Sequence, residues 1–441
     1  MDSKKILALV VVILAVIIGV KFFSSNFPLL ITVSIGFMLF SLVFFSRGVL
    51  IFLTTLTLML AASSSSGIKT ATLQLRWVFL ILCAFHVFGD ILLGRTVRKI
   101  KMFDCFAIAF IFYAFLSVSY SPFRHLTLER ATTLLLLYVS IFWIIWKYAY
   151  TEGPEKVVDL VLWATMLIVL ASYLKLFIHP AQAFKLGRFA GIFGNPNTVG
   201  MTFSILLPLS IWQYFDTKKK AALFLFFLML IGILLSASRS SINAMVVSMG
   251  YFIYARSEKY RPLVFFFSMS FILILAWIIE TLLKQFFINY FRVETIPTAA
   301  GRIEFWSIGL GLISSRPIFG YGFGIEEKLF SLKHIIGYEG VEIHFHNSYL
   351  GMALQLGIIG FLIFFGPLFM LLFKEIFSRK SSDTLLRCAL QASIIAGLVV
   401  SFFESWLYSV GNCQTFPFWI MVMLLVFYRH QDGKNSVLEG T

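Results

Sequence analysis

Long runs of apolar residues, separated by short polar connections, dominate the chain from beginning to end. A helix needs about 20 consecutive apolar residues to cross a membrane, with a range of about 17–25. Some runs, such as 48–62, are short enough to lie in the interface, so the pattern predicts about 12–14 membrane-spanning helices. The predicted spans are 6–20, 27–46, 48–62, 77–93, 102–120, 130–150, 156–178, 196–215, 220–236, 240–255, 262–283, 346–373, 385–408 and 414–428. We therefore expect an all-α integral membrane protein, with residues 1–441 as a single polytopic membrane domain.

The composition agrees with a chain that is solvated by lipid. Hydrophobic residues make up 59% of the 441 residues, and charged residues only 13%. Soluble domains carry about 25% charged residues, because their surface must face water. The four cysteines lack the spacing of a metal or redox motif, so we expect neither a cofactor nor a metal. These features exclude an ordinary soluble enzyme.

The distribution of lysine and arginine predicts the orientation of the spans. Cytoplasmic loops carry an excess of these residues, and here they gather on alternate connections, beginning with Lys4 and Lys5. Both termini are therefore expected in the cytoplasm. Lys4 and Lys5 also suit a signal peptide, but no small-x-small cleavage pattern follows, so we expect 6–20 to be a retained helix. The net charge of +15 reflects this topology and does not indicate nucleic-acid binding.

The longest connection, residues 284–345, is predicted on the outer side of the membrane. Loops of this length are usually functional or disordered, and the aromatic residues of this loop favour order. Apolar residues at helical spacing predict a short amphipathic helix over 302–315, lying in the membrane interface. Pro317 is expected to end this helix, and the Gly-x-Gly-x-Gly sequence that follows predicts a tight, flexible turn.

Two short outer segments near the middle of the chain carry candidate chemistry. In residues 188–197, RFAGIFGNPN, Asn195 is predicted to cap a helix that begins with proline. The N–H groups at such a helix start favour anions. In residues 236–241, SASRSS, Arg239 lies on an outer turn against the positive-inside preference. Arginine makes bidentate contacts to phosphate, so Arg188 and Arg239 suit a phosphate or diphosphate ligand.

Two further segments flank the long loop. The first begins the predicted loop helix with Gly-Arg-x-x-x-Trp, which contains Arg302 and Glu304. The second, HFHNSYL at 344–350, places His346 beside the start of the next helix. The positive end of that helix disfavours imidazolium, so we expect His346 to be neutral and able to accept a proton. Taken singly, each of these arginines and histidines also fits interfacial snorkelling or packing.

These segments, in this order, resemble the bacterial O-antigen ligase/polymerase family. The shared features are an Asn-Pro-Asn turn, a Ser-Arg-Ser turn, Gly-Arg-x-x-x-Trp, Pro-x-x-Gly-x-Gly-x-Gly and His-Asn-x-x-Leu, within about 185–375. The resemblance implies a GT-C-like architecture in the bacterial inner membrane, with a large periplasmic loop that contains short helices. It also implies a metal-independent, inverting glycosyltransferase that acts at the periplasmic face without a cofactor.

The resemblance implies substrates and residue roles as well. The donor would be a glycan on undecaprenyl diphosphate. The acceptor would be lipid A-core in a ligase, which we expect, or another lipid-linked repeat in a polymerase. His346 would be the catalytic base that activates the acceptor hydroxyl, and Arg302 would bind the diphosphate. Arg239 and Arg188 both remain candidates for a second diphosphate arginine. Further candidates for substrate contacts are Asn195, Asn347, Glu304 and His344.

Two other function classes fit the sequence less well. A transporter of lipid-linked glycans would share the cationic sites, but it would be expected to show repeated halves and broken helices near the midplane. Here the candidate residues gather at the outer face instead. A non-catalytic scaffold would not need an ordered outer loop with histidine and arginine at its two ends.

Overall fold

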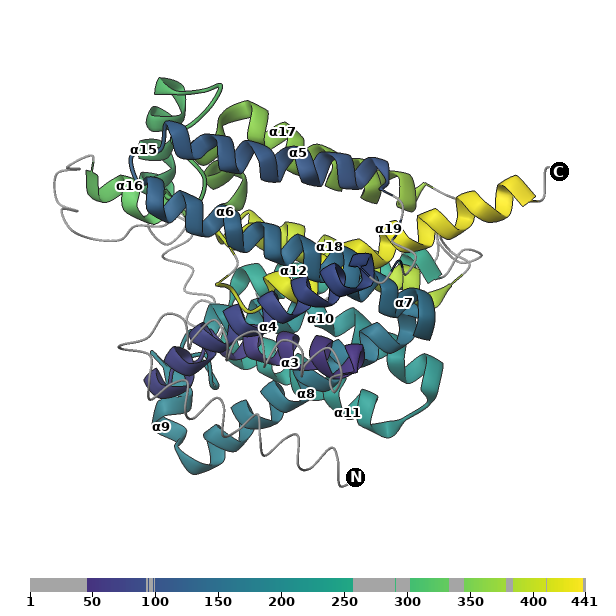
Figure 1. Cartoon of the computed structure of the whole chain (residues 1–441). Helices are drawn as coiled ribbons and strands as arrows, with labels where there is room; N and C mark the ends of the chain where they lie inside the picture. Colours follow the sequence, from purple (N-terminus) through teal and green to yellow (C-terminus); the bar gives the residue numbers. More distant parts are fainter. Residues whose placement is uncertain are drawn as a thin grey trace, which may run out of the picture.

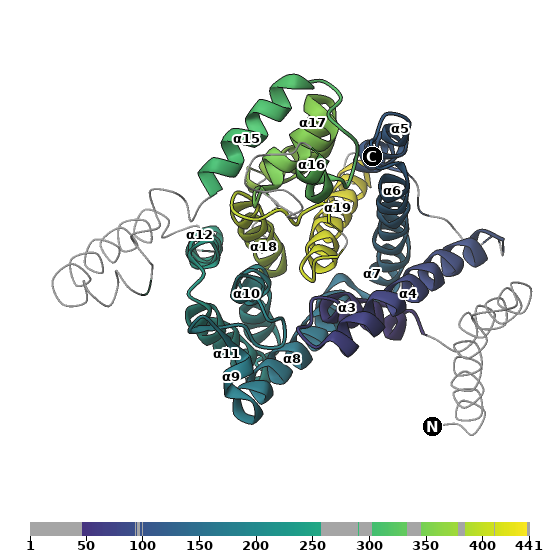
Figure 2. The same ribbon diagram turned by 90° about the vertical axis from the view of Figure 1, so that its left-hand side faces the viewer.

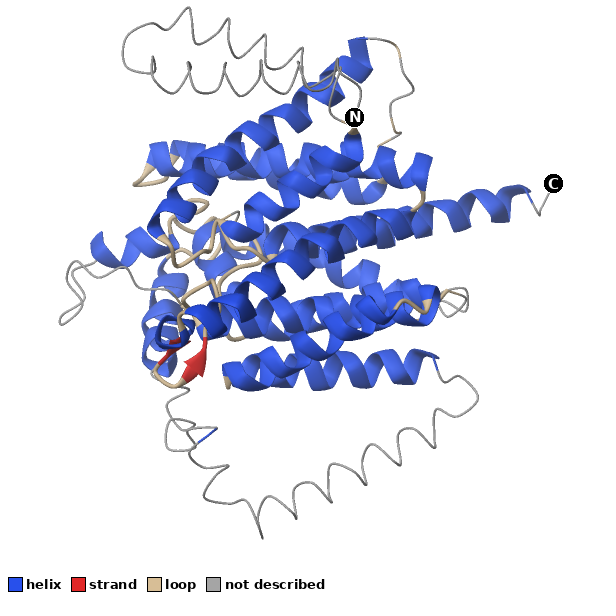
Figure 3. Cartoon of the chain, turned by 90° about the horizontal axis from the view of Figure 1, so that it is seen from below, coloured by secondary structure: helices blue, strands red, loops and turns tan. Residues whose placement is uncertain are grey.

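The computed structural model of the chain describes residues 46–92, 94, 98, 100–256, 290, 302–332, 345–377, 384–409 and 411–438. Helices account for most of this part of the chain, and a two-stranded hairpin interrupts them (Figure 3). The prediction of an all-α integral membrane protein is therefore confirmed. The predicted spans 6–20, 27–46 and 262–283 lie outside the described residues.

The described helices follow the predicted apolar runs closely. In the first half they are α3 (Arg47–Leu60), α4 (Ser66–Leu92), α5 (Met102–Leu116), η1 (Ser117–Ser119), α6 (Arg124–Val139), η2 (Ser140–Ile145), α7 (Trp146–Glu152), α8 (Pro154–Ile178) and α9 (Pro180–Ala183). After the strands β1 (Phe184–Lys185) and β2 (Arg188–Phe189) come α10 (Pro196–Thr217), α11 (Lys220–Ser236), α12 (Arg239–Arg256), α15 (Arg302–Ser315), α16 (Glu326–Leu332), α17 (Ser348–Ile376), α18 (Leu385–Ser401) and α19 (Thr415–Leu438).

Five of the described helical stretches are long and apolar enough to cross a membrane, namely Ser66–Leu92, Met102–Ser119, Arg124–Glu152, Pro154–Ile178 and Ser348–Ile376. Three shorter apolar helices, α3, α11 and α18, accompany them. The predicted spans 196–215, 240–255 and 414–428 are also helical, although α10, α12 and α19 are less apolar. The chain is thus a multi-pass membrane protein.

The helices pack as two neighbouring groups. Helix α10 packs against α11, α12 and α18, and α3 packs against α4 and α8. Helices α5, α6, α17 and α19 lie side by side in the second group, as the view along the helices shows (Figure 2). Helix α18 joins the groups through its contacts with α10, α12 and α19. Helices α15 and α16 lie together at one end of this assembly (Figure 1).

The glycine-rich turn after α15 docks onto an interruption in α17. The N–H of Gly322 donates to the carbonyl of Gln355 at 2.8 Å, and the N–H of Ile358 donates to the carbonyl of Pro317 at 2.8 Å. Gly357 supplies the interruption with φ 62° and ψ −164°, a conformation that is almost restricted to glycine. The predicted tight turn is confirmed, and its hydrogen bonds hold it against α17.

Helix α15 confirms the predicted loop helix and holds the segment before His346. The indole Nε1–H of Trp306 donates to the carbonyl of Phe345 at 2.8 Å. Phe345 is fully buried, while Ile303 and Leu310 on α15 are exposed. The arrangement explains why the Gly-Arg-x-x-x-Trp and His-Asn-x-x-Leu segments lie together although a long loop separates them in the sequence.

The docking of the glycine-rich turn yields a stability prediction. In Gly320→Val, a Cβ would lie 2.5 Å from the backbone of Gln355 at φ +69°, so we expect a destabilisation of about 1–3 kcal/mol. Thermal unfolding in detergent would measure it. The control is Gly311→Ala. Gly311 is exposed on α15, and a Cβ added there would lie within 4 Å of no other atom, so the midpoint of thermal unfolding should stay the same or rise. Equal midpoints for Gly320→Val and the native chain would contradict the docking.

Candidate active site

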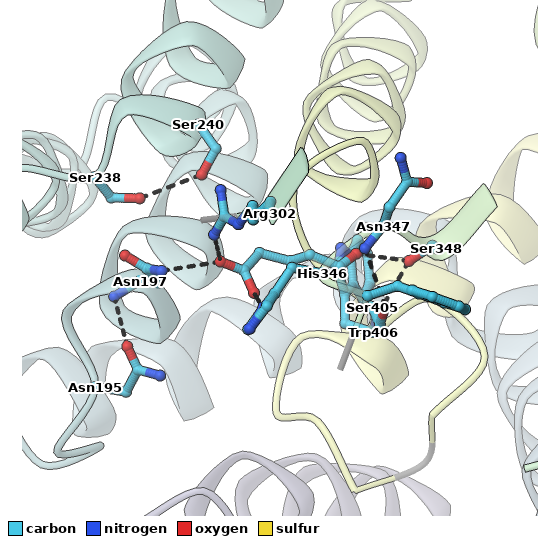
Figure 4. Close-up of polar contacts among 12 residues, drawn as sticks. Asn195, Asn197, Ser238, Ser240, Arg302, His346, Asn347, Ser348, Ser405 and Trp406 are labelled. Carbon is cyan, nitrogen blue, oxygen red and sulfur yellow. Dashed lines mark hydrogen bonds and ion pairs between the residues drawn. The ribbon is translucent and has the colours of Figure 1, made fainter. Parts of the chain in front are cut away.

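The carboxylate of Glu404 contacts two of the sequence-predicted site residues, Arg302 and His346, which Figure 4 labels. Its Oε1 lies 2.7 Å from Nη2 of Arg302, and its Oε2 lies 2.8 Å from Nδ1 of His346. Glu404 follows α18, Arg302 begins α15, and His346 precedes α17. The side chain of Glu404 is 10% exposed and that of His346 is 40% exposed, so a substrate can reach the imidazole while the carboxylate stays sheltered.

A second line of contacts reaches Glu404 from the Asn-Pro-Asn turn. Nδ2 of Asn197 donates to Oε1 of Glu404 at 2.9 Å. Arg188 in turn donates from Nη2 to Oδ1 of Asn197 at 2.7 Å and from Nε to the carbonyl of Ser236 at 2.8 Å. Arg188 therefore orients the amide of Asn197, and through that amide it acts on Glu404.

The backbone around His346 is held in an unusual conformation. His346 has φ 50°, a left-handed conformation that costs a non-glycine residue about 1–2 kcal/mol. The next residue, Asn347, caps α17 by accepting from the N–H groups of Tyr349 at 2.9 Å and Leu350 at 3.1 Å. Ser348 Oγ donates to the carbonyl of Glu404 at 2.8 Å. These contacts aim the imidazole at Glu404.

Glu326 forms a buried node behind the site. Its carboxylate accepts from the N–H of Phe345 at 2.9 Å, from Ser405 Oγ at 2.8 Å and from the hydroxyl of Tyr408 at 2.8 Å. Burial and then the Glu326 charge raise the pKa of Tyr408 well above its usual range, so the phenol remains a neutral donor. Glu326 thus connects α16, the residue before His346 and the segment that carries Glu404.

His346 and Glu404 lie on the wall of a polar cleft with an empty volume of about 1720 Å³, open solvent included. Arg76 of α4 and Arg130 of α6 line the cleft as well. Arg130 lies 3.8 Å from Glu327, which belongs to α16. Charged and polar side chains line much of the cleft, so it suits a polar substrate.

The remaining predicted site residues are placed as follows. Asn195 caps α10 by accepting from the N–H of Asn197 at 3.0 Å, as predicted, and it lines the cleft. Arg239 is half-buried and begins α12, beside Ser238 and Ser240, whose hydroxyls are 3.3 Å apart. Glu304 is exposed in the first turn of α15. His344 lies outside the described residues.

Sequence reasoning did not assign site roles to Glu404, Asn197 or Glu326. An acid in an apolar segment is a signal for function, and Glu404 at the end of the predicted span 385–408 carries that signal. Asn197 belongs to the Asn-Pro-Asn motif, although only Asn195 was singled out. Glu326 shares its loop with other acids, so nothing in the sequence distinguishes it.

The buried node yields a second stability prediction. In Glu326→Gln, an amide NH₂ would replace an oxygen that faces only donors. Because the amide NH₂ cannot accept these hydrogen bonds, we expect the free energy of unfolding to fall by about 1–3 kcal/mol. The control Glu327→Gln changes a half-buried carboxylate and should cost no more than about 1 kcal/mol. Thermal and denaturant unfolding in detergent would measure both. Equal losses in the two variants would contradict the role of the node.

Comparison with known proteins finds similarity to one family over part of the chain. The model of a family described as "O-Antigen ligase" matches residues 224–365, which include Arg239, Arg302 and His346. A Rickettsia felis protein named "Putative polysaccharide ligase" is 27% identical over 219 residues, covering 47% of this chain and 52% of the relative. A Rickettsia typhi protein with the same description is 29% identical over 141 residues, covering 30% of this chain and 33% of the relative.

The matches reach across only part of each protein, since they span about half of the first relative and a third of the second. The matched family segment runs from α11 to α17. It contains the Ser-Arg-Ser turn, Gly-Arg-x-x-x-Trp, the glycine-rich turn and His-Asn-x-x-Leu. The predicted resemblance to the O-antigen ligase family is therefore confirmed over residues 224–365, which the family model matches.

Proposed function

We propose that the protein is a membrane glycosyltransferase that moves a glycan from undecaprenyl diphosphate to an acceptor hydroxyl at the periplasmic face of the inner membrane. The observation that carries the proposal is the shared carboxylate of Glu404, which lies 2.8 Å from His346 and 2.7 Å from Arg302. This contact places a proton acceptor beside a cation that suits a leaving diphosphate. The cleft next to them supplies the space for glycan and acceptor.

His346 acts as the general base. Glu404 accepts from Nδ1–H, which leaves the lone pair on Nε2 to take a proton. The acceptor hydroxyl gives its proton to Nε2, and its oxygen forms a bond to C1 of the donor sugar. The bond between C1 and the diphosphate oxygen breaks, and its electron pair leaves with the diphosphate. Attack from the side opposite the leaving group inverts C1, and Glu404 stabilises the imidazolium.

Arg302 and Arg239 stabilise the leaving diphosphate, and Arg188 positions the site. Arginine forks match phosphate oxygens, and such fixed donors act strongly where water is scarce. Arg188 directs two of its nitrogens to Ser236 and Asn197, so its structural role is already defined. Arg239 begins α12 in the Ser-Arg-Ser turn that the family domain includes. On these grounds we assign the second diphosphate role to Arg239 and a positioning role to Arg188.

The acceptor is most consistent with lipid A-core, as in an O-antigen ligase. The matching family model carries that description, and the two Rickettsia relatives are named as polysaccharide ligases. A polymerase would use the same base and arginines to extend a lipid-linked repeat. The two reactions differ in the molecule that receives the glycan.

The distribution of lysine indicates which side of the membrane the candidate site faces. Lys101, Lys147 and Lys374 lie at the helix ends opposite to those that carry the candidate site. Cytoplasmic ends are rich in lysine and arginine, so this end faces the cytoplasm and the site faces the periplasm. The single polytopic domain, with residues 284–345 as its periplasmic loop and both termini in the cytoplasm, completes this topology.

A transfer assay with purified protein tests the reaction. The donor is a glycan on undecaprenyl diphosphate, and the acceptors are lipid A-core and a lipid-linked repeat. His346→Ala should lower the rate by about 10²–10⁴-fold, because it removes the base. Glu404→Gln should lower it by up to about 10⁴-fold, because the tautomer is no longer held. Arg302→Ala should lower it by about 10²–10³-fold.

Lys185→Gln is the matched control, since it removes an exposed cation outside the contact network on the same side of the protein. It should transfer as the native chain does. Full activity in folded His346→Ala would disprove the base assignment. Transfer only to the lipid-linked repeat would make the protein a polymerase. Movement of the lipid-linked glycan across vesicles without transfer would make it a transporter.

The division between the two arginines is tested in the same assay. Arg239→Ala should lower kcat by about 10²–10³-fold, since a diphosphate donor is lost. Arg188→Lys should retain much more activity than Arg239→Lys, because a positioning residue needs only a donor to Asn197. The reverse order of the two lysine variants would exchange the roles of Arg188 and Arg239.

A further inference from the structure

A basic groove lies at the end of the helices that is far from His346. The ends of α5, α17 and α19 form it, and its basic residues are Lys101, Lys374, Arg429 and His430. Its described lining residues include no acidic side chain. The empty volume of the groove is about 1050 Å³, open solvent included, and its floor is apolar. This groove is separate from the cleft beside His346.

The position of the groove along α17 places it at the opposite membrane surface. Ser348 begins α17 at the candidate site, and Lys374 lies near its other end. At a rise of about 1.5 Å per residue, the stretch of α17 from Ile358 to Lys374 is about 24 Å long, and Ser348 lies nine residues before the interruption at Gly357. The hydrocarbon core of a bilayer is about 30 Å thick. The groove therefore lies at the depth of the lipid headgroups on the face opposite the candidate site.

An apolar cavity continues from the groove into the helix bundle. It lies between α5, α6, α17 and α19, and its empty volume is about 620 Å³, open solvent included. Phe103, Phe106 and Pro367 line both the groove and the cavity, so the two are adjacent. Leu407 and Tyr408 line the cavity too, so a molecule in it would touch the segment that follows Glu404.

The acids nearest to the groove are occupied by ion pairs. Glu375 is fully buried and lies 2.9 Å from Arg387 and 3.3 Å from Arg429. Asp432 also pairs with Arg387, at 2.9 Å. Arg429 is 42% exposed and keeps part of its guanidinium toward solvent. Lys374 is exposed and Lys101 is half-buried, so the mouth of the groove presents positive charge.

We propose that the groove and the cavity bind an anionic phospholipid of the cytoplasmic leaflet. The phosphate lies among Lys101, Lys374 and Arg429, and one acyl chain lies on the apolar floor of the groove and enters the mouth of the apolar cavity. Basic pockets between membrane helices on the cytoplasmic side suit such headgroups. A free phosphate or a nucleotide would leave the cavity without an apolar occupant. The proposal rests on the proposed orientation of the chain and not on its enzymatic reaction.

Lipid binding to the full chain in detergent tests the proposal. The protein is titrated with dioleoylphosphatidylglycerol or with zwitterionic dioleoylphosphatidylcholine, and native mass spectrometry counts the retained lipids. Each basic residue near an anionic surface contributes about fivefold, so Lys101→Gln/Lys374→Gln should weaken binding of the anionic lipid about 30-fold. The zwitterionic lipid should bind weakly to both proteins.

Two comparison variants separate the parts of the site. Lys219→Gln/Lys220→Gln removes two exposed lysines at the same predicted face outside the groove, and it should bind lipid as the native chain does. Ala107→Trp fills the cavity that Ala107 lines, and it should weaken binding while both lysines remain. Thermal midpoints without lipid confirm that each variant is folded. If the double variant does not fold, Lys374→Gln replaces it, because this lysine is exposed.

Three results would overturn the proposal. One is retention of the anionic lipid by folded Lys101→Gln/Lys374→Gln at the native level. Another is equal retention of the two lipids by the native chain. The third is displacement of the lipid by glycerol phosphate alone, which would make the groove a site for a small anion. Glycosyl transfer is measured separately, so loss of lipid binding and loss of the proposed reaction are distinguishable.

Discussion

The carboxylate of Glu404 is the group on which the rest of the site depends. A sheltered anion in a membrane protein is costly unless cations and hydrogen-bond donors surround it. Arg302, His346 and Asn197 meet this need from three separate helix starts. Because one carboxylate satisfies all three, it also determines how α10, α15 and α17 approach one another. The electrostatic requirement of a single side chain thereby organises this end of the helix assembly.

The backbone geometry around this carboxylate explains the family motifs in physical terms. The glycine-rich turn hydrogen-bonds to α17 where Gly357 interrupts that helix. Trp306 holds the carbonyl before His346, and Glu326 holds the N–H of the same residue, Phe345. The left-handed conformation of His346 persists because its neighbours are held on both sides. Each motif therefore contributes to the orientation of one imidazole.

The two ends of α17 have different chemistry. At one end lies a cleft with a histidine and paired acids, and at the other lies a basic groove above an apolar cavity. The apolar cavity reaches Tyr408, which donates to Glu326 behind the candidate site. An occupant of the cavity would therefore pack against the segment that positions Glu404. This contact provides a physical route between the lipid environment and the site.

The sequence by itself determined the features that depend on local patterns. Apolar length predicted the membrane helices, helical spacing predicted the helix over 302–315, and asparagine before proline predicted the cap at Asn195. The order of the motifs indicated the family, because each motif is a short segment that can be read on its own. These features need only neighbouring residues or the length of an apolar run.

Only the tertiary structure decided which residues meet. Glu404 lies 58 residues from His346 and 102 residues from Arg302 along the chain, and no local pattern connects such distant positions. The same holds for Asn197, which is 207 residues from Glu404. The contacts of Arg188 with Ser236 and Asn197 likewise appear only once β2, α10 and α11 are packed. Side-chain partnership across a bundle depends on helix packing, and helix packing is a property of the whole chain.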